Sequence, residues 1–416
     1  MSLQSPPRKP RRFQTLRDTS VLTASSYGQY LIPLLTLPLI ARTLGPHGFG
    51  YSALATATYF VGSIVVDAGI SLPLAARLVT ASHDETLLRR RYTRLRVLVF
   101  ACFVLAAAGA YAVAAPYSVK LAFLGAVAGG ASSLHEQWVL VARRQFGRVA
   151  VSDWAGRLVN LAVLAAGLTL APSTVWIPAG LCAGALTTNT VSRLLATVNT
   201  AGAGASTPDL AAMVRLGAPA VLGRLLVSAY GQAAPVLYAA VLTPGALGLY
   251  SASDRVVRAV QGLANPVSLA ILPSVAKDRD RVAELAGTAR RYTLYAMAAA
   301  LVGSLGLALL AAPVAHVLYG EEFADTATIL RVQAFLLPLG VGNTMVTSAF
   351  FNVIGDTRAV LLTSVAGLAA TAAALGCTYL TGSLLVLAVG SIAAEGCAFV
   401  AAWHRVARTV RRLEGT

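Results

Sequence analysis

Residues 244–258 read Pro-Gly-Ala-Leu-Gly-Leu-Tyr-Ser-Ala-Ser-Asp-Arg-Val-Val-Arg, an apolar helical stretch that carries charge near its end. Similar signals occur in the same order near the start of the chain. Tyr-Gly-Gln at 27–29 matches Tyr-Gly-Gln at 230–232, and Tyr-Ser-Ala at 51–53 matches Tyr-Ser-Ala at 250–252. An internal repeat of this size in an apolar chain is typical of a membrane transporter built from two related halves.

The composition also indicates a membrane protein. Hydrophobic residues make up 56% of the chain and charged residues only 12%, whereas a soluble domain has about 25% charged residues. At roughly 20 apolar residues per crossing, the pattern predicts an all-α polytopic membrane protein with about twelve transmembrane helices. The predicted spans are 20–44, 50–79, 95–115, 119–142, 150–172, 175–198, 216–242, 247–275, 291–312, 326–351, 359–381 and 383–403.

The predicted spans divide into two six-helix lobes, 19–198 and 216–403. A Gly/Ala/Ser/Pro-rich segment at 199–215 reads as a linker between them. Residues 1–18 are predicted to be a disordered basic tail, and 404–416 a second basic tail. Because each lobe has an even number of spans, both enter the bilayer from the same side. The expected pseudo-two-fold axis therefore runs along the membrane normal.

The net charge of +16 follows the membrane topology. Most Lys and Arg residues lie in alternate connections and at the two ends of the chain, which is the positive-inside pattern. It predicts a multi-pass protein of the cytoplasmic membrane with both termini in the cytoplasm. The basic loops face lipid headgroups, so no nucleic-acid partner is expected. The four cysteines lie in apolar spans without metal spacing, and no metal site is predicted.

A polar stripe runs along the predicted eighth span. Asp254, Arg258, Gln261 and Asn265 fall on one helical face, and Arg255 borders that face. Charged groups inside a span are costly and usually face the bundle interior or water. We therefore expect these residues to border a hydrated vestibule.

Further spans carry similar polar stripes at helical spacing. Their members are Arg224, Ser228 and Gln232 in the seventh span, Asp153, Arg157 and Asn160 in the fifth, and Thr56, Tyr59, Ser63 and Asp67 in the second. The preponderance of arginine favours an anionic substrate, because guanidinium binds phosphate in a bidentate way and stays charged.

The acids in the spans leave two interpretations open. Glu395, Asp254, Asp67 and Glu136 could take up H⁺ or Na⁺ and couple transport to an ion gradient. Alternatively, Asp254 with Arg258 and Asp153 with Arg157 are i, i+4 pairs that neutralise each other. No phosphate-binding loop, nucleophile elbow or zinc motif is present. The sequence therefore favours a carrier without a cofactor over an enzyme.

Four motifs carry a family resemblance, at 37–51 (LPLIARTLGPHGFGY), 242–250 (LTPGALGLY), 319–323 (YGEEF) and 351–358 (FNVIGDTR). With the span layout, they make the chain resemble the bacterial polysaccharide (O-antigen, Wzx-type) flippases of the multidrug/oligosaccharidyl-lipid/polysaccharide exporter superfamily. The likeness covers about residues 20–404.

The resemblance implies alternating access in the inner membrane, with two lobes rocking about a central cationic cavity. The substrate would be a polyprenyl-pyrophosphate-linked oligosaccharide, and a glycan polymerase and other assembly proteins would be partners. Carried over residue by residue, the cavity arginines would be Arg224, Arg255 and Arg258, with Arg157 from the other lobe. The substrate-binding set predicted from stripes and resemblance together is completed by Gln232, Gln261 and Asn265. A cation-coupled multidrug exporter and a non-transporting glycan-assembly protein remain as alternatives.

Overall fold

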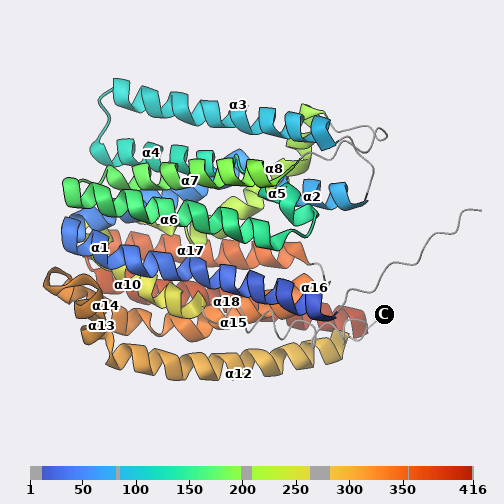
Figure 1. The fold of residues 1–416 in the computed structure, drawn as a ribbon. Coiled ribbons are helices and arrows are strands. Elements are labelled where there is room, and N and C mark those ends of the chain that lie inside the picture. The colour runs from blue at the N-terminus through green and yellow to red at the C-terminus, as the bar shows by residue number, and fades with distance from the viewer. Residues whose placement is uncertain (1–11, 81–84, 198–208, 263–281, 355, 415–416) are drawn as a thin grey trace, which may run out of the picture.

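The computed structural model describes residues 12–80, 85–197, 209–262, 282–354 and 356–414. Every regular element among them is a helix, and the long helices lie side by side in one bundle (Figure 1). Seven of these helices are long and apolar enough to cross a membrane, and a bent helix pair makes an eighth candidate.

The N-terminal half of the chain, up to residue 197, contains seven described helices. They are α1 (Arg12–Asp67), α2 (Ser71–Thr80), α3 (Glu85–Ala112), α4 (Tyr117–Ser132), α5 (Gln137–Ala142), α6 (Phe146–Leu170) and α7 (Trp176–Leu195).

The C-terminal half, from residue 209, contains the remaining described helices. They are α8 (Leu210–Tyr230), α9 (Ala234–Tyr238), α10 (Pro244–Gly262), α12 (Val282–Leu309), α13 (Ala311–Tyr319), the 3₁₀ turn η1 (Glu321–Phe323), α14 (Ala324–Gln333), α15 (Leu336–Val346), the π-helical turn η2 (Thr347–Phe351), α16 (Asn352–Ile354), α17 (Thr357–Thr381) and α18 (Leu384–Glu414).

Helix α1 contains the first predicted span, the turn after it and the part of the second predicted span up to Asp67. Gly45 has φ +63° and breaks the helix at this turn, a backbone conformation that glycine adopts without strain. The boundary predicted at residue 79 is wrong: α1 ends at Asp67, because Ala68 and Gly69 both take positive φ. We call the two ends of the bundle the Gly45 end and the Asp67 end; they lie at the left and right of Figure 1.

Several predicted span boundaries are corrected by breaks inside the helices. The span at 119–142 is divided into α4 and α5, and the span at 216–242 into α8 and α9. The span at 326–351 consists of α14 and α15, which meet at an angle of 53°. The segment 404–414 continues α18 as helix.

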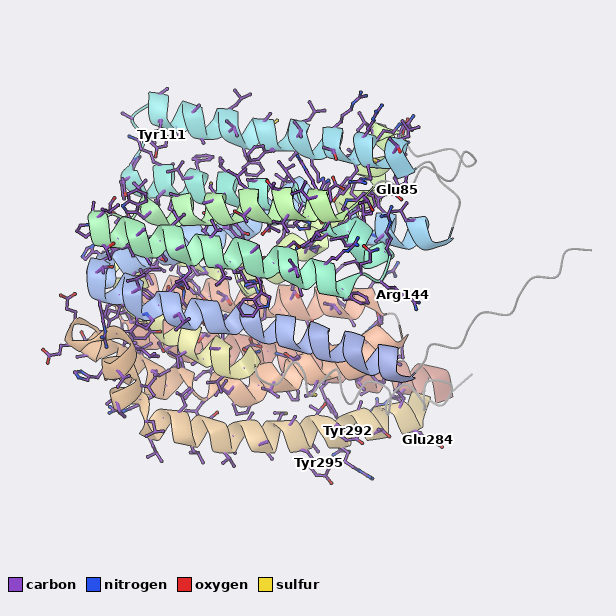
Figure 2. The ribbon with its side chains drawn as sticks, viewed as in Figure 1. Glu85, Tyr111, Arg144, Glu284, Tyr292 and Tyr295 are labelled. Atoms are coloured by element: carbon purple, nitrogen blue, oxygen red, sulfur yellow. The ribbon has the colours of Figure 1, made fainter. Side chains whose placement is uncertain are left out.

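The predicted start of the third span at residue 95 is also wrong, because α3 begins at Glu85. The arginines that precede the predicted span, Arg89, Arg90, Arg91 and Arg94, are therefore helical. Figure 2 shows that Glu85, Arg144 and Glu284 lie at the Asp67 end, whereas Tyr111 lies at the opposite end.

The two halves meet along α1 and α10, and they pack closely at the Gly45 end. A Cβ atom on Gly50 would lie 1.9 Å from the Pro244 carbonyl oxygen, and one on Gly248 would lie 1.9 Å from that of Pro46. The repeat seen in the sequence therefore brings equivalent residues into reciprocal contact.

Aromatic side chains cover the same end of the bundle. Phe49 of α1 packs edge-on against Tyr319 and Phe323, and all three are fully buried. The Tyr319 hydroxyl donates to the Ala252 carbonyl oxygen at 2.9 Å. Phe49 of α1 and Tyr319 of α13 are therefore in direct apolar contact at this end.

Candidate functional site

Two adjoining cavities lie in the interior of the bundle. The α6 cavity, about 440 Å³, lies among α1, the α4–α5 turn, α6 and α7. The α10 cavity, about 120 Å³, lies between α1 of the N-terminal half and the α8–α9 turn and α10 of the C-terminal half. Thr56, Phe60 and Gln232 border both, so the two cavities share a polar edge.

Helix α10 brings three charged residues to the α10 cavity: Asp254, Arg255 and Arg258. Arg258 Nε donates to Asp254 Oδ2 at 2.7 Å, so the i, i+4 pairing expected from the sequence is present. Arg255 Nη2 donates to Thr56 Oγ1 at 3.4 Å, and its guanidinium lies over the Phe49 ring at 5.2 Å. Among the described residues no carboxylate lies within ion-pair distance of Arg255, although Asp254 is near enough to interact with it electrostatically.

Helix α6 brings Asp153, Arg157 and Asn160 to the α6 cavity, on the one helical face that their spacing predicted. The i, i+4 ion pair expected between Asp153 and Arg157 is replaced by a different contact. Gln137 Nε2 donates to Asp153 Oδ1 at 2.6 Å and to Ser152 Oγ at 2.9 Å. Arg157 makes no hydrogen bond or ion pair with any residue that the structure describes.

The predicted glutamine and asparagine ligands fall in different places. Gln232 is exposed and lies at the shared edge of the two cavities. Gln261 points at Gly340 of α15, where a Cβ would lie 2.7 Å from its Nε2, and it borders neither cavity. Asn265 lies outside the described residues.

Arg224 pairs with an acid of the other half and borders neither of the two cavities. Its Nη1 lies 2.7 Å from Asp67 Oδ2, which links α8 to the end of α1. Asp67 also accepts from the Tyr92 hydroxyl at 2.9 Å and from Ser71 Oγ at 3.1 Å. The side chain of Arg224 is 51% exposed, so water screens this ion pair.

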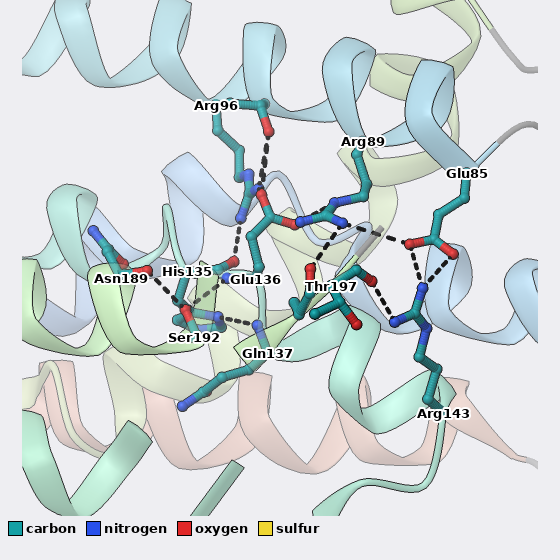
Figure 3. Close-up of polar contacts among 12 residues, drawn as sticks. Glu85, Arg89, Arg96, His135, Glu136, Gln137, Arg143, Asn189, Ser192 and Thr197 are labelled. Carbon is teal, nitrogen blue, oxygen red and sulfur yellow. Dashed lines mark hydrogen bonds and ion pairs between the residues drawn. The ribbon is translucent and has the colours of Figure 1, made fainter. Parts of the chain in front are cut away.

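Glu136 is held in a dense network in the N-terminal half (Figure 3). Its carboxylate lies 3.3 Å from Arg96 and 3.4 Å from Arg89. Arg96, which is 1% exposed, also donates to the carbonyl oxygens of Ser133 at 2.7 Å and His135 at 2.8 Å. An acid compensated by two arginines favours a structural role over ion coupling.

Glu395 of α18 has different surroundings, although it is also buried. Its carboxylate accepts from Asn343 Nδ2 at 2.6 Å, and the Tyr230 phenol lies beside it. No described cation lies within ion-pair distance of Glu395. Of the four predicted ion-coupling acids, Glu395 alone is without an arginine partner in the part of the chain that the structure describes.

Some residues at the cavities were not predicted from the sequence, Gln137 and His135 above all. Both lie where the predicted fourth span breaks between α4 and α5. The signal that could have located them is the run Ser-Ser-Leu-His-Glu-Gln at 132–137, which interrupts an otherwise apolar span.

The fold is similar to that of solved transporters. A lipid II flippase MurJ in an inward closed conformation superposes with a TM-score of 0.72, covering 92% of this chain and 87% of that chain at 12% identity. An inward-facing multidrug resistance MATE family transporter of the MOP superfamily gives 0.65, with 92% and 99% coverage at 14% identity. An outward-facing multidrug resistance MATE family transporter of the MOP superfamily gives 0.54, with 96% and 95% coverage at 15% identity. The prediction of an all-helical polytopic membrane protein is therefore confirmed.

The sequence itself also matches a family model. No curated protein gives a match, but residues 15–278 match the model described as polysaccharide biosynthesis protein. This confirms the resemblance inferred from the motifs and agrees with the expectation of a carrier rather than an enzyme. The chain therefore belongs to the polysaccharide biosynthesis protein family.

Proposed function

We propose that the chain is a flippase that moves a polyprenyl-pyrophosphate-linked oligosaccharide from the cytoplasmic to the outer leaflet by alternating access. The observation that carries this proposal is Arg255, a cation at a cavity between the two halves that has no carboxylate partner among the described residues. Keeping such a charge within membrane spans costs free energy, and its retention is typical of a functional site.

Pyrophosphate suits the α10 cavity better than a cationic drug does. Arg258 lies one helical turn from Arg255 and also borders the cavity. Its Nε pairs with Asp254, and its other guanidinium nitrogens can donate to a ligand. Guanidinium binds phosphate oxygens in a bidentate way. The net charge that Asp254, Arg255 and Arg258 contribute is positive, which attracts an anion and repels a cation.

The proposal includes a topology of twelve spans in two six-helix lobes of a bacterial inner membrane, with both termini in the cytoplasm. The reciprocal contact of Gly50 and Gly248 supports a pseudo-two-fold axis between the lobes. Arg89 and Arg143 pair with Glu85, which lies at the Asp67 end (Figure 2), and this supports placing that end in the cytoplasm. The Gly45 end would then close the outer side.

The test is the sidedness of lipid-linked sugars in cells without this protein. We expect a lipid-linked glycan to accumulate on the cytoplasmic leaflet, to be cleared by the intact gene, and to persist with Arg255→Ala. Arg331→Ala, which removes an exposed arginine from α14, is the control and should clear it. No accumulation, combined with increased sensitivity to cationic drugs, would contradict the flippase and favour the drug exporter.

A further inference from the structure

The α6 cavity differs in chemistry from the α10 cavity beside it. It is bordered by one carboxylate, one guanidinium, three side-chain amides, an imidazole and hydroxyl groups, from residues that include Asp153, Arg157, Gln137, Asn160, His135 and Thr188. We infer that this cavity binds the sugar that adjoins the pyrophosphate of the lipid-linked glycan. The inference rests on the proposed function and adds a second, sugar-specific subsite to it.

The hydrogen-bonding groups that face the α6 cavity suit hydroxyl groups. Asp153 uses Oδ1 to accept from Gln137, which leaves Oδ2 as an acceptor. The amide of Asn160 makes no hydrogen bond within the part of the chain that the structure describes, and it both donates and accepts. A sugar hydroxyl likewise donates and accepts, so this mixed set matches a sugar.

His135 adds a further polar group. Its Nδ1 accepts the backbone N–H of Gln137 at 3.3 Å, which fixes the ring and leaves Nε2 without a partner among the described residues. Arg157, also without such a partner, can donate to hydroxyl oxygens from the same helix as Asn160. Ordered side chains of this kind fix a ligand's orientation.

The carboxylate of Asp153 argues against a second phosphate site in the α6 cavity. Phosphate and carboxylate oxygens both carry negative charge and both accept hydrogen bonds, and like charges repel strongly where water is scarce. The α6 cavity has one arginine, Arg157, for its one acid, whereas the α10 cavity has two arginines for one acid. The two cavities therefore divide between an anion and a polar, neutral ligand.

Aromatic rings complete the α6 cavity. Tyr59 and Phe60 border it, with centroids 5.7 Å apart and planes at 85°. Ring faces pack against the apolar C–H groups of a sugar, as in small-molecule sites lined by aromatic side chains with a few placed polar groups. The cavity's 440 Å³ lies within the range of roughly 300–1,000 Å³ typical of such sites.

The edge that the two cavities share connects the proposed pyrophosphate subsite with the proposed sugar subsite. Thr56 and Gln232 border both spaces, and Thr56 also accepts from Arg255. A pyrophosphate held at Arg255 and Arg258 would direct its attached sugar across this edge toward Asn160. The geometry thus joins the two subsites in the order in which the substrate's groups are linked.

Binding to the purified protein in phospholipid nanodiscs tests the inference. The probes are undecaprenyl pyrophosphate and the lipid-linked glycan extracted from cells that lack the protein. We expect the intact protein to bind the glycan form at least about tenfold more tightly, a difference of about 1.4 kcal/mol. Asn160→Ala and Asp153→Asn should each remove this preference and leave the affinity for undecaprenyl pyrophosphate unchanged.

The controls separate this inference from the proposed function. Thr190→Ala, on an exposed face of α7, should keep the preference, and Arg255→Ala should weaken binding of both probes. Equal binding of both probes by the intact protein would overturn the sugar subsite and leave the flippase intact. Failure of both probes to bind, or no accumulated glycan to extract, would overturn the flippase as well. Equal losses for both probes in Asn160→Ala and Asp153→Asn would overturn the division into two subsites.

Discussion

Arg96 and Arg255 both lie inside helices of a membrane-spanning chain, but their surroundings are opposite. Arg96 has a carboxylate at 3.3 Å, two carbonyl acceptors and the Tyr92 ring at 4.1 Å. Arg255 has one threonine hydroxyl at 3.4 Å and the face of Phe49. The difference teaches how to separate structural from functional charge. A compensated arginine stabilises the fold, whereas one that lies at a cavity without a carboxylate at ion-pair distance is available to a ligand.

The largest expected effect comes from removing the compensated arginine. Arg96→Ala leaves Glu136 buried with a single, more distant arginine, and breaking a buried pair costs about 3–5 kcal/mol. We expect little protein in the membrane and a lower midpoint of thermal unfolding in detergent. Arg94→Ala, on the exposed side of the same helix, should leave both unchanged. Normal abundance and an unchanged midpoint for Arg96→Ala would show that Arg96 does not stabilise the fold.

The Asp254–Arg258 pair tests the same distinction within one site. If Arg258 binds substrate, Asp254→Asn should preserve export because the guanidinium stays, and Arg258→Gln should reduce export at least about tenfold, or 1.4 kcal/mol. The measurement is the rate at which lipid-linked glycan becomes accessible to label at the outer surface. Equal losses in the two variants would show that the pair only neutralises charge.

Helical periodicity predicted much of the cavity lining. The stripe Asp153, Arg157 and Asn160 does border one cavity, and Asp254, Arg255 and Arg258 border the other. Residues on one helix face are separated by short, regular steps, so their common direction can be read from sequence. The Gly45 turn was also predicted, because a Gly-Pro pair interrupts the apolar run.

Contacts between distant helices could not be predicted. Nothing in the local pattern tells that Gln137 holds Asp153, or that Arg224 reaches Asp67 across the two halves. The polar run at 132–137 could have marked the break between α4 and α5, but it does not show that the break turns Glu136 toward Arg96. Arg96 lies at the start of the span predicted at 95–115, and only its buried acidic partner shows why an arginine belongs there.

The pair between Asp67 and Arg224 is expected to have a smaller effect. Because Arg224 is half exposed, a double-mutant cycle with Asp67→Asn and Arg224→Gln should give a coupling energy below about 1 kcal/mol in unfolding. This pair joins the two halves, so opening between them would have to break it. We expect the export rate to change in Arg224→Gln by less than about fivefold, the factor that 1 kcal/mol allows.

The control for that pair lies within the C-terminal half. Arg405 Nε lies 2.9 Å from Asp356 Oδ2, and both residues stay on the same side of any opening between the halves. Arg405→Gln should therefore leave export unchanged. If Arg405→Gln and Arg224→Gln alter export equally, the link across the halves has no special role.

The smallest effect on stability is expected at Glu395. This acid has no arginine partner among the described residues and is compared with Glu136, which has two. Glu395→Gln keeps an oxygen that accepts from Asn343, so the unfolding midpoint should barely move. If the carboxylate takes up a proton during transport, the variant loses the dependence of export on the pH gradient. Glu136→Gln should lower the unfolding midpoint, because it weakens the pairing with Arg89 and Arg96. It should leave the dependence of export on the pH gradient unchanged, because it removes no free carboxylate. Export measured in inverted vesicles at several imposed pH gradients distinguishes the two acids. A gradient dependence that survives in Glu395→Gln would exclude this acid, and one lost in Glu136→Gln would mean that compensation by arginine does not mark a structural charge in this chain.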